Sequence, residues 1–194
     1  MEKVSYALGL SLGNNLLGSG VKELHYENIG KGIQDVLEQN EPQMGVEEAQ
    51  AIITEFFQSL QSSMGEKAQA EGVAFLAENA TRENVVTLPS GLQYEIITKG
   101  DGEIPTAANT VKVHYHGTTV DGNVFDSSVR RGEPATFGVT QVIAGWVEAL
   151  QLMPVGSKWK LFIPSDLAYG AQGAGQAIAP HATLIFEVEL LEIV

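Results

Sequence analysis

Aromatic residues are concentrated in the second half of the sequence, between residues 110 and 190. A single aromatic residue in a strand favours a role in the core, because such side chains are normally packed. Aromatic residues in or beside loops are harder to explain in this way: Phe125 leads directly into Asp126, and Tyr169 lies within the stretch 166–170. The pattern indicates an apolar cavity lined by some members of the set Tyr115, Phe125, Phe137, Trp146, Trp159, Phe162, Tyr169 and Phe186.

Asp126 is the acidic residue that directly follows one of these aromatics. A carboxyl group in aromatic surroundings could have a raised pKa and act as a general acid. Such catalysis would need a second acid or base, and none is placed to work with Asp126. The sequence therefore favours a role for Asp126 other than proton transfer.

Three other patterns suggest chemistry but lack a necessary partner. The glycine-rich run 170–175 is followed by a strand, whereas a phosphate-binding loop needs a helix amino terminus, so we interpret it as a loop over the cavity. His114 and His116 share one strand face and could chelate a metal, but no third ligand is evident. Ser127 and Ser128 have no nearby histidine base, which disfavours a serine hydrolase.

A short helix over residues 142–150 must position Trp146. Apolar residues recur there at helical spacing, polar residues precede the segment, and Pro154 prevents the helix from continuing much beyond it. Trp146 is either a core residue or the floor of a pocket.

The pattern changes from helical to alternating after residue 84, which predicts a domain boundary. Strands are expected around residues 92–98, 111–115, 158–163 and 182–194, with a tight turn at 121–123. Four or five antiparallel strands and one short helix predict an α+β domain over residues 85–194. As the only helix expected there, the short helix must cover the apolar face of the sheet.

Residues 1–84 have helical periodicity throughout. Two short helices precede a long one, which runs over about residues 46–80. Two short helices cannot cover both ends of so long a helix, so we predict a homodimer formed through residues 1–80. Gly9 and Gly13, four residues apart, give weak support for close helix packing. The alternative is a monomeric helical hairpin that packs on the second half.

The composition excludes several classes of protein. The chain has 44% hydrophobic residues and no cysteine, so disulfides, thiolate metal sites and cysteine nucleophiles are absent. The net charge is −13, which disfavours binding to nucleic acid. No apolar run is long enough to insert into a membrane, and no signal peptide is evident. We therefore expect a cytoplasmic protein as the sequence stands, or a periplasmic or surface-anchored one if an export signal has been removed.

Five motifs occur in order along residues 85–194. They are Val111–Gly117, Asp121-Gly122 with Phe125–Ser128, Val142–Trp146, Ile163-Pro164 with Ala168–Gly170, and Pro180–Leu190. Together they resemble the FKBP family of peptidyl-prolyl cis-trans isomerases. The helical first half is similar to the dimerisation region of bacterial two-domain members of the macrophage-infectivity-potentiator type.

This resemblance implies an antiparallel sheet half wrapped around the short helix, with a proline-binding cavity between them. Trp146 would form the floor of this cavity, Tyr169 would donate a hydroxyl, and Asp126 would be the one charge inside, where it orients neighbouring side chains or polarises the surroundings of the substrate carbonyl. The remaining catalytic positions implied are Tyr115, Phe125 and Phe186, and the substrate-binding positions are Phe137, Val142, Ile143 and Ile178.

The function implied is the isomerisation of X-Pro bonds in unfolded or flexible protein chains. No cofactor or metal is expected, and a macrolide inhibitor is a further expected ligand, although the small residues Ala174 and Ala177 leave the loop trimmed. The alternative is a non-catalytic chaperone or a proline-motif binding module that keeps the fold. A weaker alternative is metal handling by His114 and His116.

Overall fold

The computed structural model describes residues 1–194, which form two compact units, Met1–Ser63 and Met64–Val194. The long helix α3 (Val46–Asn79) belongs to both. The predicted boundary after residue 84 marks the change from helix to strand, since β1 begins at Val85. The compact units divide earlier, because residues 64–79 of α3 pack within the carboxy-terminal unit.

The amino-terminal unit contains α1 (Glu2–Gly18), α2 (Tyr26–Glu38) and the first part of α3, as the helical periodicity predicts. Its helices bury little: α1 has no buried residue, and Val21 and Asp35 are the unit's buried residues. Several large apolar side chains are exposed, including Tyr6 at 71%, Leu10 at 54% and Leu17 at 62%. None of the chain's helices combines the length and apolarity of a membrane span.

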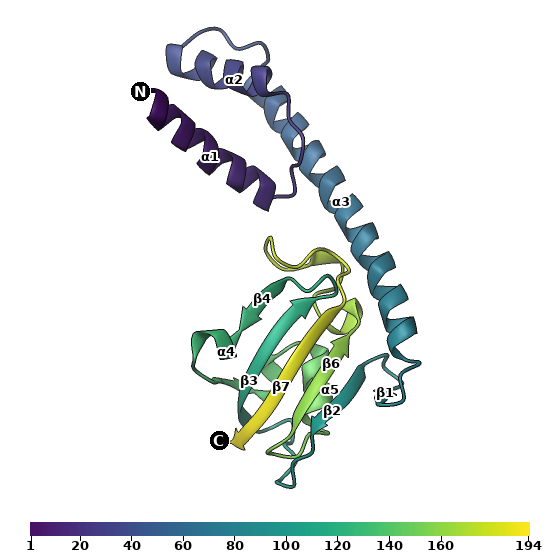
Figure 1. Ribbon diagram of the computed structural model, residues 1–194. Coiled ribbons are helices and arrows are strands. Elements are labelled where there is room, and N and C mark those ends of the chain that lie inside the picture. The colour runs from purple at the N-terminus through teal and green to yellow at the C-terminus, as the bar shows by residue number, and fades with distance from the viewer. The chain divides into compact units, whose positions relative to one another are not determined.

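The carboxy-terminal unit is built on one antiparallel sheet (Figure 1). The path of the sheet is β1-β2-β6-β7-β3-β4, and β5 also pairs with β3. Seven strands are present where four or five were predicted, because three of them are only three or four residues long and show no clear alternation. The strands are β1 (Val85–Thr87), β2 (Gln93–Thr98), β3 (Thr110–Thr119), β4 (Val124–Ser127), β5 (Ala135–Gly138), β6 (Lys158–Ile163) and β7 (Leu184–Ile193).

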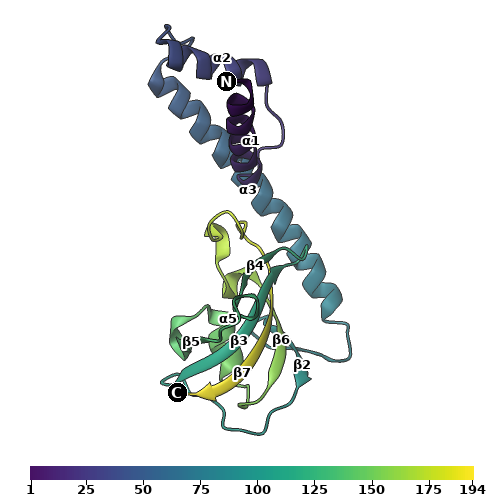
Figure 2. The same ribbon diagram turned by 60° about the vertical axis from the view of Figure 1, so that its left-hand side comes forward.

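The helix α5 (Ala144–Leu150) lies against one face of this sheet (Figure 2). The alternation of β3 places Val111, Val113 and Tyr115 on that face, where all are buried. Trp146 is 4% exposed and belongs to the same core, so the prediction that the helix covers the apolar face is confirmed. The helix begins two residues later than predicted, because its first turn is preceded by a 3₁₀ turn at Val139–Gln141.

The end of α3 covers part of the opposite face of the sheet, which the sequence did not predict. Phe162 of β6 is 2% exposed because the Phe75 ring packs on it, with centroids 5.8 Å apart. Asn79 donates to the Gln93 side chain at 2.8 Å, and Gln93 in turn donates to the Leu76 carbonyl at 2.9 Å. A sequence pattern shows that a helix has an apolar face, but not which surface that face will meet.

Candidate active site

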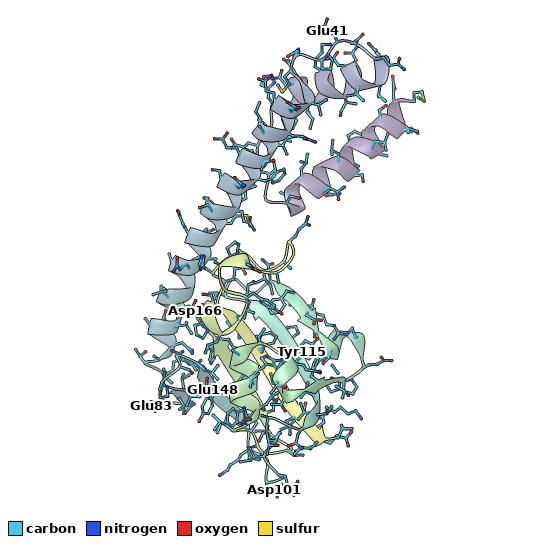
Figure 3. The ribbon with its side chains drawn as sticks, turned by 180° about the vertical axis from the view of Figure 1, so that it is seen from behind. Glu41, Glu83, Asp101, Tyr115, Glu148 and Asp166 are labelled. Carbon is cyan, nitrogen blue, oxygen red and sulfur yellow. The ribbon has the colours of Figure 1, made fainter.

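Three aromatic side chains, one of them Tyr115 (labelled in Figure 3), meet where α5 crosses β3 and β7. The Trp146 ring packs edge to face on Tyr115 and Phe186, with centroids 5.5 and 5.3 Å apart. All three residues are at least nine-tenths buried. Edge-to-face packing places the positive edge of one ring on the negative face of another and fixes the rings relative to each other.

Two half-buried rings extend this group toward the surface. Phe125 of β4 packs on Phe186 at 5.4 Å, and Phe137 of β5 packs on Trp146 at 6.0 Å. Gly117 makes room for the first pair: a Cβ at this position would lie 2.7 Å from atoms of both Phe125 and Phe186. The structure therefore brings together Trp146, the predicted floor, and four other aromatic positions predicted for the cavity. We call these five residues the aromatic cluster: Tyr115, Phe125, Phe137, Trp146 and Phe186.

Not every aromatic residue of this half belongs to the aromatic cluster. Trp159 is buried and stacks on Tyr94, with centroids 4.3 Å apart, and Phe162 lies under α3. Both are therefore packing residues, as a single aromatic in a strand suggests. Tyr169 makes none of the cluster's ring contacts and is 41% exposed, at the start of the turn Gly170–Gln172.

Asp126 lies at the edge of the aromatic cluster in a closed hydrogen-bond network. The Tyr115 hydroxyl donates to one carboxylate oxygen, and the Arg131 guanidinium donates to the other. Arg131 also donates to the Tyr115 hydroxyl oxygen at 2.9 Å, and its guanidinium carbon lies 5.6 Å from the centroid of that ring. Each of the three groups thus holds the other two.

This network keeps Asp126 ionised. Burial opposes the charge, but hydrogen bonds from Tyr115 and Arg131 outweigh it and hold the pKa of Asp126 below its ordinary value. Burial, followed by the hydrogen bond to Asp126, raises the pKa of the Tyr115 hydroxyl. A general acid needs a raised carboxyl pKa, so the lowered pKa of Asp126 argues against that role.

Arg131 is a site residue that the sequence reading missed. The one-turn helix α4 (Ser128–Arg131) begins two residues after Asp126 and turns Arg131 back toward it. Ser127 caps this turn by accepting from the Arg130 amide at 3.2 Å. The sequence contains the signal, because a serine followed by a one-turn helix and Gly132 is a capped turn, but the turn is too short to show helical periodicity.

The expectation that Ser127 and Ser128 have no nearby histidine is wrong. His116 Nδ1 lies 2.9 Å from the Ser127 hydroxyl, and His114 Nδ1 lies 3.1 Å from the Ser128 hydroxyl. The histidines come from β3, which pairs with β4 so that His116 lies opposite Ser127, the last residue of β4. Both serines are at least nine-tenths buried, and Ser128 also bonds the Tyr115 amide at 2.7 Å. These hydroxyls are structural groups that anchor α4 to β3.

The remaining predicted site residues lie on two segments. Val142 and Ile143 are half-buried, directly before α5. The Ile143 carbonyl accepts from the Trp146 and Val147 amides at 2.9 and 3.1 Å, while its own amide takes no part in these bonds. Ile178 is 6% exposed within the core and pairs with Ala174 in an isolated bridge. The structure contains no group of three or more side chains that could hold a metal ion, so His114 and His116 gain no third ligand.

The arrangement is suited to binding without covalent chemistry. It combines a buried apolar floor, two half-buried aromatic walls and one ionised carboxylate whose oxygens are both bonded. Such a surface can bind a compact apolar ring and stabilise one shape of it over another.

Two known families match the chain, and together they cover all but seven of its residues. Residues 101–191 match the family described as FKBP-type peptidyl-prolyl cis-trans isomerase. Residues 1–96 match the domain described as amino terminal to FKBP-type peptidyl-prolyl isomerase.

Similar proteins and a solved structure point the same way. The chain is 49% identical to the FKBP-type 22 kDa peptidyl-prolyl cis-trans isomerase of Escherichia coli, over 98% of this chain and 94% of that protein. It is 42% identical to the outer membrane protein MIP of Legionella longbeachae, over 99% of this chain and 85% of that protein. The crystal structure of FkpA from Escherichia coli superimposes with a TM-score of 0.74 at 35% identity, covering 98% and 95% of the two chains.

Proposed function

The chain belongs to the FKBP-type peptidyl-prolyl cis-trans isomerases and catalyses the rotation of X-Pro bonds, and we propose that the aromatic cluster is the surface on which it does so. One observation carries this proposal. The Trp146 ring is buried and fixed by three other aromatic rings, while Phe125 and Phe137 remain half-exposed beside it.

The mechanism requires no nucleophile. Rotation about a peptide bond is opposed by a barrier of about 18–20 kcal/mol, which arises from the partial double bond. The twisted amide has lost this resonance and is less charge-separated than the planar form. An apolar aromatic surface therefore disfavours the planar ground state relative to the twisted state.

Two groups are placed to favour the twisted bond further. We assign the Ile143 amide as a donor to a substrate carbonyl, since it lies at the entry to α5 and takes no part in the hydrogen bonds of that turn. The Tyr169 hydroxyl is the second proposed donor, because its side chain is 41% exposed. Val142 lies on the same segment as Ile143. Ile178, which pairs with Ala174, is proposed to support the substrate from its own loop.

Asp126 acts through its neighbours in this proposal. Its two oxygens hold the Tyr115 hydroxyl and the Arg131 guanidinium, so the ring of Tyr115 stays fixed against Trp146. The charge is in this way paired rather than available for proton transfer. Asp126 and Arg131 are positioning residues, whereas the aromatic rings contact the substrate.

A proline-peptide exchange assay tests the proposal. We expect the protein to accelerate cis-trans exchange in peptides that differ in the residue before proline, and a macrolide to compete with these peptides for the aromatic cluster. An acceleration that a saturating macrolide leaves unchanged would contradict a shared site. Exchange at the uncatalysed rate would contradict the isomerase function itself.

We further propose that the amino-terminal unit forms a homodimer. The support is the exposure of Tyr6, Leu10 and Leu17 on a helix that buries no residue within its own chain. Large exposed apolar patches mark interaction surfaces in soluble proteins. A second copy of the chain is the proposed occupant, because most soluble oligomers are homo-oligomers and the twofold dimer is the commonest of them.

The half-exposed rings of Phe125 and Phe137 favour a second function, in which the same aromatic surface holds unfolded chains without isomerising them. Refolding two client proteins would separate it from catalysis, one client having a slow proline-limited phase and the other none. Isomerisation accelerates only the refolding of the client with the proline-limited phase. An equal benefit to both clients would favour holding.

A further inference from the structure

The carboxy-terminal part of α3 packs closely on the segment that leads into β7. Gly65, Gly72 and Asn79 are the buried residues of α3, and their spacing of seven places them on one helix face. Glycine in a helix interior is unfavourable by about 1 kcal/mol relative to alanine. Two such residues on the buried face point to contacts that a side chain would prevent.

The contact of Gly72 leaves no room for a methyl group unless its neighbour moves, and the contact of Gly65 is tight but milder. An added Cβ on Gly72 would lie 2.4 Å from Thr183 Oγ1 and 3.0 Å from Thr183 Cβ. At Gly65 it would lie 3.0 Å from Pro180 Cβ and 3.6 Å from His181 Cδ2. Thr183 is 4% exposed and precedes the first residue of β7, so it has little room to move aside.

The segment on which these glycines pack closes a loop, which we call the 170–183 loop. His181 N donates to the Gly170 carbonyl at 2.8 Å, and Ala174 and Ile178 exchange two hydrogen bonds at 2.9 and 3.1 Å. His181 itself has a φ of 58°, a conformation that a non-glycine residue adopts only when its surroundings impose it. Pro180 and His181 meet Gly65 at this point, so α3 supports the strained turn.

Both ends of the 170–183 loop lead to the proposed site. Tyr169 directly precedes it, and Phe186 of the aromatic cluster lies three residues beyond Thr183. A displacement of Thr183 would therefore move the loop and the start of β7 together. Because the interior is close-packed, such a shift is transmitted rather than absorbed.

We propose that Gly72 and Gly65 are positioning residues for the isomerase reaction: α3 sets the position of the 170–183 loop through the Gly72–Thr183 and Gly65–Pro180 contacts. The inference rests on the proposed function, because it takes Tyr169 and Phe186 as groups of the site. It assigns to α3 a role in selecting the chain segment around the proline, in addition to linking the two units.

Gly72→Ala in the full-length chain tests this inference. We expect kcat/KM for proline peptides to fall about 3- to 10-fold, because small misplacements of positioning groups are costly in catalysis. The ratio of rates between peptides that differ before proline should also change. A loss of folded protein alone would lower all rates equally and leave that ratio unchanged.

Four further variants sharpen the experiment. Gly72→Ala combined with Thr183→Ala removes the closest contact and should recover most of kcat/KM, while Thr183→Ala alone gives the baseline for that comparison. Ala74→Leu adds bulk to an exposed position of the same helix and should leave the rates unchanged. If Gly72→Ala does not fold, Gly65→Ala, with its milder 3.0 Å contact, should give the same change in ratio to a smaller extent.

The inference would be overturned if Gly72→Ala folds and keeps the wild-type kcat/KM and the wild-type ratio of rates between peptides. If Gly72→Ala does not fold, an unchanged ratio of rates in Gly65→Ala would overturn it. Failure of the double variant to recover would also overturn it, because the effect would then not pass through Thr183. Inactivity of the wild-type chain would instead contradict the proposed function.

Discussion

Asp126 is kept charged beside aromatic rings because its two oxygens are bonded to Tyr115 and Arg131. Its folded-state pKa is depressed, so its contribution to stability is present above the unfolded pKa of about 3.9 and is lost as the pH falls through the lower folded value. We expect Asp126→Asn to destabilise the protein by about 1 kcal/mol or less at pH 7, since both partners are partly solvated.

Urea unfolding of wild type and Asp126→Asn at pH 7 and at pH 3 or below measures this difference. The difference in the free energy of unfolding between the two proteins, which we call the gap, should shrink at the lower pH. A gap that widens under acid conditions would mean that the carboxyl pKa is raised, and the general-acid role would have to be reconsidered.

Arg131 and Arg130 offer a matched pair of arginine substitutions. Arg131→Gln removes both hydrogen bonds to the network and should lower kcat/KM for proline peptides about 3- to 10-fold, because the Tyr115 ring is released. No side-chain bond of Arg130 contributes to this network, so Arg130→Gln should leave kcat/KM unchanged. Equal effects of the two substitutions would indicate a general electrostatic cause.

The types of the residues at the site could be predicted from the sequence, but their hydrogen-bond partners could not. The family resemblance of the five motifs pointed to Asp126 and to the aromatic positions, and the structure places these rings together. Arg131 was missed because the turn that brings it to Asp126 is a single helical turn, and the serine–histidine pairs were missed because strand pairing, not proximity in sequence, creates them.

At the scale of elements, the junction between α3 and the sheet depends on buried amides. Asn79 is 3% exposed and accepts from Arg82 at 2.9 Å while it donates to Gln93. Asn79→Ala should destabilise the protein by about 1–3 kcal/mol, because the buried Gln93 oxygen loses its partner. Denaturant unfolding measures the change.

Gln69→Ala, at an exposed position of α3, is the control and should be nearly neutral. Replacing Asn79 and Gln93 together by leucine should recover part of the loss, since no buried amide is then left unpaired. A neutral Asn79→Ala would mean that the end of α3 is not held to the sheet by this network.

Long elements were predicted better than short ones. The periodicity of α3 and the alternation of β3 and β7 extend over enough residues to be recognised, whereas β1, β4 and β5 are too short. The docking of α3 was missed for another reason: Gly65 and Gly72 weaken the apolar pattern at the positions where the helix makes its closest contacts.

For the whole molecule, the proposed dimer accounts for the exposed apolar side chains of α1. We expect light scattering to give twice the chain mass of 20.8 kDa. Leu10→Glu, which places a charge on the exposed apolar surface, should reduce the mass to that of one chain.

Ile104→Glu is the control, because Ile104 is 50% exposed in a loop of the carboxy-terminal unit and should not affect assembly. A wild-type mass of one chain at micromolar concentration would contradict the dimer. Dissociation of the dimer by both substitutions would mean that the loss of assembly is not specific to the surface of α1.

We propose that prolyl bonds rotate over the aromatic cluster and that the ring of Trp146 is the floor on which this reaction depends. Trp146→Leu and Trp159→Leu test it most directly, since both indoles are 4% exposed and neither indole nitrogen has a hydrogen-bond partner, while only Trp146 belongs to the aromatic cluster. The measurement is kcat/KM for a proline peptide, per folded molecule. We predict a loss of about 10-fold or more for Trp146→Leu, since the surface that favours the twisted bond is removed, and a rate close to wild type for Trp159→Leu. Equal rates for the two variants would mean that the ring of Trp146 has no special part in the reaction.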